Sequence, residues 1–291
     1  MRKNAILVSA ADDKFFPLLQ GLVSSVRRAK EIADLPIIVL DVGLNADGKG
    51  WLNKHSAKVV RVDWDFESLA IANVPEFFKA QAWRPFLPRH LPDAQVYVWM
   101  DADTWVQDEQ AILLAIECAC ERPSIVVVPE ISRFYQTMYG PGHEFRTKEA
   151  SIYRTCFGKR LAYQLTAKPL INSGFFAMAR SSEYWTLWAD VLREMYRRVI
   201  QFYTEQCSLN VSIYARNMKW VPLPAYCNWI CCHALPAFDE DRHRYVEPGS
   251  PHQEIWIMHL AGPTKTGEHQ ISTSKGRTIT RSLRFSQEQQ E

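Results

Sequence analysis

Short apolar runs alternate with longer helix-like segments through the first half of the chain, and this alternation limits the possible folds more than any other feature of the sequence. The apolar runs predict strands over residues 4–10, 35–43, 58–64, 95–103 and 123–130. The segments between them predict helices over residues 15–30, 51–57, 76–91 and 109–121. The helix over residues 76–91 is expected to break near Pro85 and Pro88. Strands that alternate with helices form a mostly parallel sheet with helices on both faces, so we predict a single-domain α/β fold.

The second half of the chain departs from this strict alternation. Residues 168–180 predict a strand that is interrupted at Asn172 to Gly174, and residues 254–262 predict another strand late in the chain. Helices are predicted over residues 181–203 and from residue 205 onward.

Composition limits the partners and the compartment. The formal net charge of +2 gives no argument for a nucleic-acid partner. The sequence predicts neither a signal peptide nor a membrane span, which needs about 20 apolar residues. The 7 cysteines are an odd number at irregular spacing, as expected for free thiols in a reducing cytoplasm, where we expect the protein to reside. The tightest cysteine group, Cys227 to His233, lacks the second, separated pair that structural zinc sites usually show.

The last segment of the chain is polar and basic. Residues from Ser272 onward include Lys275, Arg277, Arg281 and Arg284. We expect residues 268–291 to form a loose tail that makes at most a weak, peripheral contact with an anionic membrane at its inner face.

The apolar run Val96 to Met100 leads directly into Asp101-Ala102-Asp103. Residues i and i+2 of an extended segment share one face, so the two carboxylates point the same way. Two like charges this close raise each other's pKa unless a positive charge lies between them, and hard divalent cations prefer such oxygen ligands. Open α/β sheets bind ligands beyond the carboxyl ends of their strands, where both aspartates are placed. The motif therefore predicts a metal site, with a solvated turn as the alternative.

Two chemistries use such a pair of aspartates. One is that of haloacid-dehalogenase-type phosphatases, in which an apolar strand leads into two aspartates and a threonine, and magnesium neutralises the phosphate. Asp101 to Thr104 resemble that string. The motif usually lies near the start of those chains, however, and the late acidic cluster here, residues 238–243, lies in a polar loop. A phosphatase is therefore the alternative function.

The other chemistry is transfer of a sugar from a nucleoside diphosphate. Its leaving group needs a metal between the diphosphate oxygens and cationic donors around them. The late predicted strand and the loop after it supply His259, Gly262 and Lys265. A histidine beside Asp101 and Asp103 makes a mixed nitrogen and oxygen site that suits Mn²⁺, or Mg²⁺.

Four segments in this order resemble the sequence pattern of GT-A-type glycosyltransferases, and they are most similar to glycosyltransferase family 8. The segments are SAADDKFF, FKAQAWRPFLPRHLPDAQVYVWMDAD, LINSGFF, and EQCSLN followed by HLAGPTK. The resemblance implies a GT-A-type, Rossmann-like catalytic domain over residues 1–267, with a nucleotide-binding half over residues 1–130 and a half over residues 131–267 that completes the acceptor and metal sites. It also implies a retaining, metal-dependent transfer of a hexose from a nucleotide sugar, with UDP-sugar as the expected donor. The acceptor is a carbohydrate, a lipid-linked molecule or a protein, and the sequence leaves these open.

The resemblance assigns roles at the metal and the diphosphate. Asp101, Asp103 and His259 would hold the metal, and Lys265 would bind diphosphate oxygens as a compact cation. The residues assigned to this part of the donor site are Asp101, Ala102, Asp103, His259, Gly262 and Lys265.

The resemblance also assigns the nucleoside end of the donor. Ala10 and Asp12 would contact the base and the ribose. Phe15 stands where the family usually has a tyrosine that stacks on uracil, and its ring face can still stack. Lys79 and Arg84 match a basic pair that contacts the donor.

Three further residues match the catalytic part of the family pattern. Asn172 would face the donor sugar, and Glu205 and Gln206 match an Asp-Gln pair at the start of a helix beneath that sugar. An amide is poorly basic, so Gln206 would position and stabilise, whereas Glu205 would orient substrate hydroxyls. Two schemes for retention stay open, namely attack on the face that the diphosphate leaves and a covalent intermediate on the protein.

Two other nucleotide-binding functions are alternatives for this sequence. A protein that binds a nucleotide sugar without turnover is the non-enzymatic alternative, but the presence of Asn172, Glu205 and Gln206 favours catalysis. A nucleotidyltransferase would carry a glycine-rich basic loop after its first strand, and residues 9–17 contain no glycine. The acceptor loops are expected at residues 136–148 and 226–251. Their aromatic residues, which either stack on sugar rings or pack in the core, are Tyr139, Trp229 and Tyr245, with Tyr135 just before the first loop.

Overall fold

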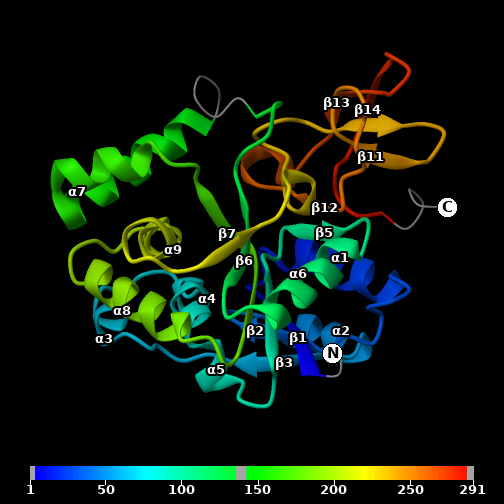
Figure 1. The fold of residues 1–291 in the computed structure, drawn as a ribbon. Helices are drawn as coiled ribbons and strands as arrows, with labels where there is room; N and C mark the ends of the chain where they lie inside the picture. Colours follow the sequence, from blue (N-terminus) through cyan, green and yellow to red (C-terminus); the bar gives the residue numbers. More distant parts are fainter. Residues whose placement is uncertain (1–3, 136–141, 287–291) are drawn as a thin grey trace.

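A seven-stranded sheet crosses the centre of the protein (Figure 1). The computed structural model describes residues 4–135 and 142–286. The strands of this sheet are β1 (Ala5–Ala11), β2 (Ile37–Asp41), β3 (Ala57–Arg61), β4 (Val96–Met100), β6 (Ile125–Pro129), β7 (Ile171–Ala179) and β8 (Trp220–Pro222). Their order is β3-β2-β1-β4-β7-β6-β8, and the pairs are parallel except that β7 runs antiparallel to β4 and β6. The mostly parallel sheet predicted from the alternation is confirmed.

Helices cover both faces of the sheet, as predicted (Figure 1). The helices on one face are α1 (Phe16–Arg28), α2 (Ala46–Lys54) and α6 (Gln110–Glu121). Those on the other face are α4 (Phe78–Trp83), α5 (Leu87–His90), α8 (Tyr184–Tyr196) and α9 (Thr204–Ala215). The short turn η2 (Arg84–Phe86) joins α4 to α5, so the helix predicted over residues 76–91 breaks where its two prolines require it.

Two helices lie outside these layers. The helix α3 (Glu67–Ile71) packs through Leu69 against residues of α4 and α8. The helix α7 (Gly142–Thr166) packs against α8 and α9 rather than against the sheet, and Gly158, with a φ of 80°, interrupts its helical backbone. The described part of α7 therefore lies against helices that cover one face of the sheet.

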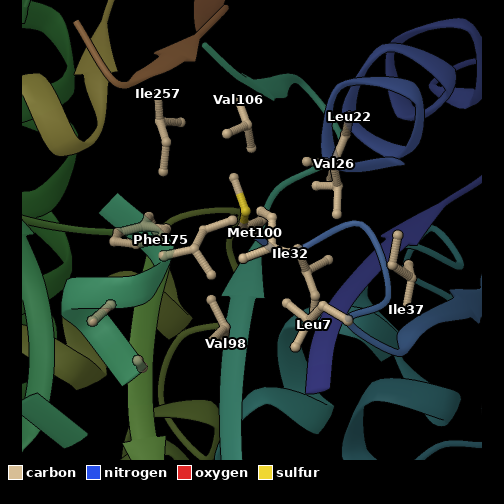
Figure 2. Packing of buried hydrophobic residues seen from close by; sticks show 14 of the residues in the cluster. Leu7, Leu22, Val26, Ile32, Ile37, Val98, Met100, Val106, Phe175 and Ile257 are labelled. Carbon is tan, nitrogen blue, oxygen red and sulfur yellow. The ribbon is translucent and has the colours of Figure 1, made fainter. Parts of the chain in front are cut away.

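Alternate side chains of β4 enter different halves of the core. Val98 and Met100 pack with residues of α1 on one face, where Figure 2 shows them near Leu22 and beside Phe175 of β7. Trp99 belongs to the core on the opposite face, as the period of two in a strand requires. Full burial of a large apolar side chain stabilises a fold by roughly 1.5–3 kcal/mol. Packing on both faces therefore stabilises β4, the strand that leads into Asp101-Ala102-Asp103, which we call the DxD motif.

A smaller sheet brings a late segment of the chain to the DxD motif. Its strands are β5 (Thr104–Val106), β12 (Ile257–His259) and β9 (Trp229–Ile230), in the order β5-β12-β9. The strand β12 runs antiparallel to β5 and pairs His259 with Thr104. The backbone N–H of Leu260 donates a 2.8 Å hydrogen bond to the carbonyl oxygen of Asp103. This pairing places His259 next to the two aspartates.

The strand β7 corrects one expectation. We predicted an interruption at Asn172 to Gly174, but β7 is continuous from Ile171 to Ala179. The irregularity lies in its pairing with β6, whose register shifts between Val127 and Pro129. The asparagine and glycine therefore remain in the strand while its pairing on one side loosens around them.

The C-terminal segment corrects another expectation. Instead of a loose tail, described residues after 268 form the hairpin β13 (His269–Ser272) and β14 (Thr278–Arg281), which lies near β10 (Ala237–Asp239) and β11 (Arg244–Val246) (Figure 1). Ile271 and Leu283 are buried, and the carbonyl oxygen of Leu283 accepts a 2.9 Å hydrogen bond from Nε1 of Trp105. These two buried apolar side chains help to hold the largely polar segment against the rest of the protein.

The basic side chains of this hairpin contact the protein itself. Arg277 pairs with Glu240, the Arg281 guanidinium lies 4.0 Å from the centre of the Phe238 ring, and Nε of Arg284 donates a 2.7 Å hydrogen bond to a backbone carbonyl oxygen. The basic side chains for which we expected at most a weak membrane contact therefore interact with other residues of the protein. Within the described ranges, no helix is both long and apolar enough to cross a membrane.

Candidate functional site

A cavity of about 370 Å³ opens at the carboxyl ends of β1 and β4, beside the amino end of the antiparallel β7. Open α/β sheets bind ligands at this edge. The predicted site residues that line it are Ala10, Asp12, Phe15, Arg84, Asp101, Ala102, Asp103, Asn172, Glu205, Gln206, His259, Gly262 and Lys265. The cavity thus collects residues from segments that lie far apart in the sequence.

Lys79 is the predicted site residue that the structure leaves outside this cavity. Its Nζ pairs with Glu76 and lies 5.1 Å from the centre of the Trp64 ring. Lys79 and Arg84 belong to different turns of a broken helix, and only Arg84 points inward. The pairing of these two residues as donor contacts is therefore not supported by the structure.

Asp101, Asp103 and His259 converge on one side of the cavity. Each offers one ligand atom, and these atoms lie within 4.8 Å of one another. Asp101 follows β4, Asp103 precedes β5 and His259 ends β12, so the pairing of β5 with β12 completes the group. Two carboxylates and an imidazole make a donor set that suits Mn²⁺ or Mg²⁺.

Neighbouring side chains orient these ligand atoms. Nε1 of Trp99 donates a 2.8 Å hydrogen bond to Oδ1 of Asp101. Nδ1 of His259 lies 3.1 Å from Oδ1 of Asn228, and an Nδ1–H that donates to this oxygen leaves the lone pair on Nε2 for a metal. This Nε2 lies 3.5 Å from Oδ1 of Asp103. The imidazole therefore presents its free nitrogen toward the carboxylates.

Gly174 leaves the space in which the ligand atoms meet. A Cβ at this position would lie 2.6 Å from Cε1 of His259 and 2.8 Å from Oδ2 of Asp101. Both distances are shorter than the contacts that a Cβ atom makes in proteins, so any residue other than glycine would displace the ligands. The absence of a side chain here fits a site in which a carboxylate and an imidazole approach one ion.

Replacement of Gly174 by alanine is expected to weaken Mn²⁺ binding by about 10- to 100-fold, the range for changes beside metal ligands. The added methyl group would displace His259 or Asp101. Calorimetric titration of the metal-free protein with Mn²⁺ measures the effect. Gly50→Ala in α2 is the matched control, because a Cβ there meets nothing within 4 Å. Equal Mn²⁺ affinity in the two variants would contradict the assignment.

Lys265 extends the site beyond the metal ligands. Its Nζ lies 2.7 Å from Oδ2 of Asp103 and 4.8 Å from the centre of the Phe15 ring. Burial would raise the pKa of Asp103, but its interactions with His259 and Lys265 outweigh burial and hold this pKa well below its usual range. Gly262, with a φ of 63°, bends the loop that carries the lysine. A cation and an ionised carboxylate therefore stand side by side at the cavity wall.

The end of β1 forms another wall of the cavity. Ala10 is the penultimate residue of this strand, and Asp12 directly follows the strand. Oδ1 of Asp12 accepts a 2.9 Å hydrogen bond from the backbone N–H of Phe15, which fixes the loop before α1. Phe15 is half-buried and keeps its ring at the cavity, near Lys265.

Arg84 links the metal group to Glu205. One of its terminal nitrogens, Nη2, lies 2.5 Å from Oδ1 of Asp101, and Nη1 pairs with Oε2 of Glu205. Nη1 also donates a 2.8 Å hydrogen bond to Oγ of Ser173, and the guanidinium lies 4.6 Å from the centre of the Trp99 ring. Burial alone disfavours the charge, but the two carboxylates outweigh it and hold the pKa of Arg84 above its ordinary value.

Glu205 is a buried carboxyl at the cavity, with 1% of its surface exposed. Burial raises the pKa of Glu205 to about 7, although Arg84 and a 3.0 Å hydrogen bond from Oγ of Ser173 act in the opposite direction. Its second oxygen, Oε1, is buried and has no hydrogen-bond partner among the described residues. That oxygen therefore has unused hydrogen-bonding capacity beside the cavity.

Asn172 and Gln206 meet beside this carboxyl. Nδ2 of Asn172 lies 3.4 Å from Oε1 of Gln206 and 3.2 Å from Oε1 of Glu130. Oδ1 of Asn172 accepts a 3.3 Å hydrogen bond from Nδ2 of Asn228. A chain of hydrogen bonds thus runs from His259 through the two asparagines to Gln206.

Several residues of the site escaped the sequence analysis. Trp99 lies two residues before Asp101 in β4, so the period of a strand was a signal that it shares the same face. Asn228 and His233 lie in the cysteine-rich group, inside the expected acceptor loop 226–251, but the sequence assigned neither residue a role at the metal or the donor. Glu130 directly follows the strand β6, and the contact of its carboxylate with Asn172 had no signal in the sequence.

His233 and Glu130 form a buried pair at the cavity, with 2.8 Å between Nε2 and Oε2. Burial lowers the pKa of His233, but Cys232 and Glu130 outweigh burial and raise it to about 10. The cysteines near it are free thiols, and the described groups that converge as metal ligands are the two aspartates and His259. Of the aromatic residues in the expected acceptor loops, Tyr139 lies outside the described residues.

The phosphatase alternative gains no support from the position of the late acidic cluster. Asp239 binds Arg242 and begins the turn between β10 and β11. None of residues 238–243, all of which the structure describes, lines the cavity with Asp101 and Asp103. A second acidic group beside the DxD motif therefore does not come from this segment.

The fold resembles that of solved glycosyltransferases. The galactosyltransferase LgtC, in complex with donor and acceptor sugar analogues, matches with a TM-score of 0.55 at 16% identity, over 89% of this chain and 87% of that chain. Mouse xyloside xylosyltransferase 1, in its apo form, matches with a TM-score of 0.54 at 12% identity, over 90% of this chain and 99% of that chain. The bifunctional glycosyltransferase WbbM, also in its apo form, matches with a TM-score of 0.55 at 15% identity, over 89% of this chain but 46% of that chain.

Sequence comparisons add no assignment, because no protein-family model and no curated protein matches the chain. At identities this low, the likeness to solved structures concerns the fold alone. The chain therefore has the GT-A fold of these glycosyltransferases, as the sequence resemblance implied.

Proposed function

We propose that the protein is a metal-dependent glycosyltransferase that moves a hexose from a nucleoside diphosphate sugar, with UDP-sugar as the expected donor, to a carbohydrate acceptor. One observation carries this proposal. The metal-ligand group and Lys265 lie in the same cavity as Asn172, Glu205 and Gln206, on a GT-A fold. We further propose the retaining chemistry of glycosyltransferase family 8, because the cavity residues follow that family's pattern.

The metal-ligand group supports a diphosphate site. Asp101, Asp103 and His259 would hold Mn²⁺, or Mg²⁺, which when bound would neutralise negative charge on the diphosphate. Lys265 would bind diphosphate oxygens, since its Nζ lies beside the metal group with 28% of the side chain exposed. A compact ammonium group is suited to that contact.

The donor would extend from this point in two directions. The base and ribose would lie over Ala10, Asp12 and Phe15 at the end of β1, with the Phe15 ring offered for stacking. The sugar would lie toward Asn172 and Gln206. Residues 1–130 would thus serve as the nucleotide-binding half, and residues 131–267 would complete the metal and acceptor sites.

The surroundings of Glu205 support a role in orienting substrate hydroxyls. Oε2 is held by Arg84 and Ser173, so this carboxyl is fixed in position. The unpartnered Oε1 would receive a hydroxyl of the sugar. A carboxyl that is buried and paired with a guanidinium is poorly placed to attack, which favours the retention scheme without a covalent intermediate on Glu205.

A thermal-shift panel tests the proposal, with UDP, GDP and several UDP-sugars, each measured with Mn²⁺ and with EDTA. A ligand at 100 times its Kd stabilises the folded state by about 2.7 kcal/mol and raises the Tm by about 5 °C or more. UDP-sugars are expected to give this shift only with Mn²⁺, and release of UDP from the stabilising sugar nucleotide should then be measurable.

Other outcomes would contradict specific parts of the proposal. Stabilisation by phosphate mimics with Mg²⁺, and by no nucleotide, would indicate a phosphatase. Stabilisation by a UDP-sugar without any release of UDP, alone or with a panel of acceptor sugars, would indicate a nucleotide-sugar-binding protein without turnover.

A further inference from the structure

Glu149 lies in α7, a helix that carries none of the residues predicted for the site. Its side chain is buried, with 1% of the residue exposed, and Oε1 accepts a 3.1 Å hydrogen bond from Nε2 of Gln206. The helix α7 packs on α9 and reaches the cavity through this contact. Burial of an ionisable group costs stability, so a buried carboxyl beside the cavity is a candidate for a functional position.

The contact completes the hydrogen bonds of the Gln206 amide. Oε1 of Gln206 accepts from the backbone N–H of Ser173 at 3.2 Å and from Nδ2 of Asn172 at 3.4 Å. Both donors lie on β7, while the acceptor Glu149 lies on the opposite side of the amide. Donors on one side and an acceptor on the other allow only one orientation of the amide.

The charged groups around Glu149 come from several elements. Arg146 precedes it in α7, Glu130 directly follows β6, and His233 follows β9. Tyr153 of α7 and Cys207 of α9 also face it. Burial, together with the charge of Glu130, raises the pKa of Glu149 to about 8. The neutral and the ionised carboxyl both offer an acceptor to Gln206.

We propose that Glu149 is a positioning residue, which fixes the Gln206 amide in the single orientation that the donor sugar meets. This inference rests on the proposed function, since Gln206 is the residue that would contact the sugar. Glu149 itself does not line the cavity, so its effect on the reaction passes through Gln206. A small misplacement of a positioning group is enough to slow a reaction by about 100-fold.

Two substitutions separate positioning from simple packing. Glu149→Gln keeps an acceptor oxygen at the same place, and Glu149→Met keeps a similar volume without one. We expect Glu149→Met to lower kcat for release of UDP from a UDP-sugar by about 10- to 100-fold, with little change in KM, and Glu149→Gln to restore most of kcat. Glu117→Gln, at an exposed position of α6, is the matched control and should behave as wild type.

A second measurement needs no substrate. The side-chain ¹⁵N–¹H₂ signal of Gln206, assigned by its loss in Gln206→Glu, should show, besides any movement from the neighbouring Glu205 near pH 7, a separate movement near the Glu149 pKa of about 8 in the wild-type protein. Glu149→Gln should abolish this titration while keeping the signal sharp and slowly exchanging with solvent. Glu149→Met should broaden it or bring it to the shift of an exposed amide.

The two measurements distinguish failure of this inference from failure of the proposed function. An identical Gln206 signal in the wild-type protein and in Glu149→Met would overturn the positioning role, whatever the protein catalyses. Equal loss of kcat in Glu149→Met and Glu149→Gln would overturn it as well. If the wild-type protein binds no nucleotide sugar, the proposed function fails, and the Gln206 signal still decides whether Glu149 holds this amide.

Discussion

Asp103→Asn is expected to abolish Mn²⁺-dependent stabilisation by UDP-sugars and to lower turnover by about 10³-fold or more, which corresponds to roughly 4 kcal/mol of lost transition-state stabilisation. Asp103 is the centre of the metal group, with Nε2 of His259 at 3.5 Å from one oxygen and Nζ of Lys265 at 2.7 Å from the other. An amide keeps the shape of the side chain but removes the charge and one acceptor. Thermal shift with Mn²⁺ and release of UDP measure the two effects.

Asp93→Asn provides the control for this change. Asp93 lies in an exposed position of the same segment, before β4, and does not line the cavity. The control should bind metal and donor as the wild-type protein does. An Asp103→Asn variant that retains the Mn²⁺-dependent shift would show that the ion is not bound at this group.

Arg84→Met is expected to destabilise the fold by about 3–5 kcal/mol at pH 7, the usual cost of removing one partner of a buried ion pair. Arg84 pairs with Asp101 and with Glu205, and its own side chain is 8% exposed. The methionine would fill much of the space but leave both carboxylates without their cation. Urea unfolding of the full chain measures the loss.

The pH dependence of this loss follows from Glu205. Its pKa is raised to about 7 in the fold, from an ordinary value of 4.5, so the stability linked to its neutral form is fully present below about pH 4.5 and is lost as pH rises through 7. Arg84 acts against this rise, so its removal should move the pKa of Glu205 still higher. The difference in unfolding free energy between wild type and Arg84→Met should therefore be larger at pH 8 than at pH 5.5.

A double variant and a control sharpen this test. Arg84→Met with Glu205→Gln should recover part of the loss, because the glutamine needs no cation. Arg197→Met, at an exposed position after α8, should change stability by less than about 0.5 kcal/mol. A loss in Arg84→Met that is the same at both pH values would contradict the coupling to Glu205.

The local patterns of the sequence were sufficient for the layers of the fold. The alternation of apolar runs and helix-like segments predicted the mostly parallel sheet, and the two prolines predicted the break between α4 and α5. The C-terminal hairpin was missed for the converse reason. Its composition is polar, and its two buried apolar residues, Ile271 and Leu283, show too little apolar periodicity for the sequence to predict strands.

The candidate site divides in the same way. Asp101 and Asp103 could be placed on one face from the sequence, because the period of an extended strand is a property of the local backbone. Their proximity to His259 depends on the pairing of β5 with β12. The link from Arg84 to Glu205 depends on the packing of η2 against α8, which in turn packs against α9. The resemblance to the family predicted these residues as site residues, but the distances between them depend on the tertiary structure.

Lys79 and Glu149 show most directly what only the tertiary structure decided. Lys79 matched the family pattern but lies outside the cavity, because the break after α4 turns Arg84 inward and leaves Lys79 with Glu76. Glu149 matched no pattern, yet the packing of α7 on α9 brings it to Gln206. The sequence by itself determined the alternation of strands and helices in the first half of the chain, the two faces of β4 and the aspartate pair, since each follows from the period of the backbone. Contacts between distant segments depend on strand register and helix packing, which the whole chain sets together.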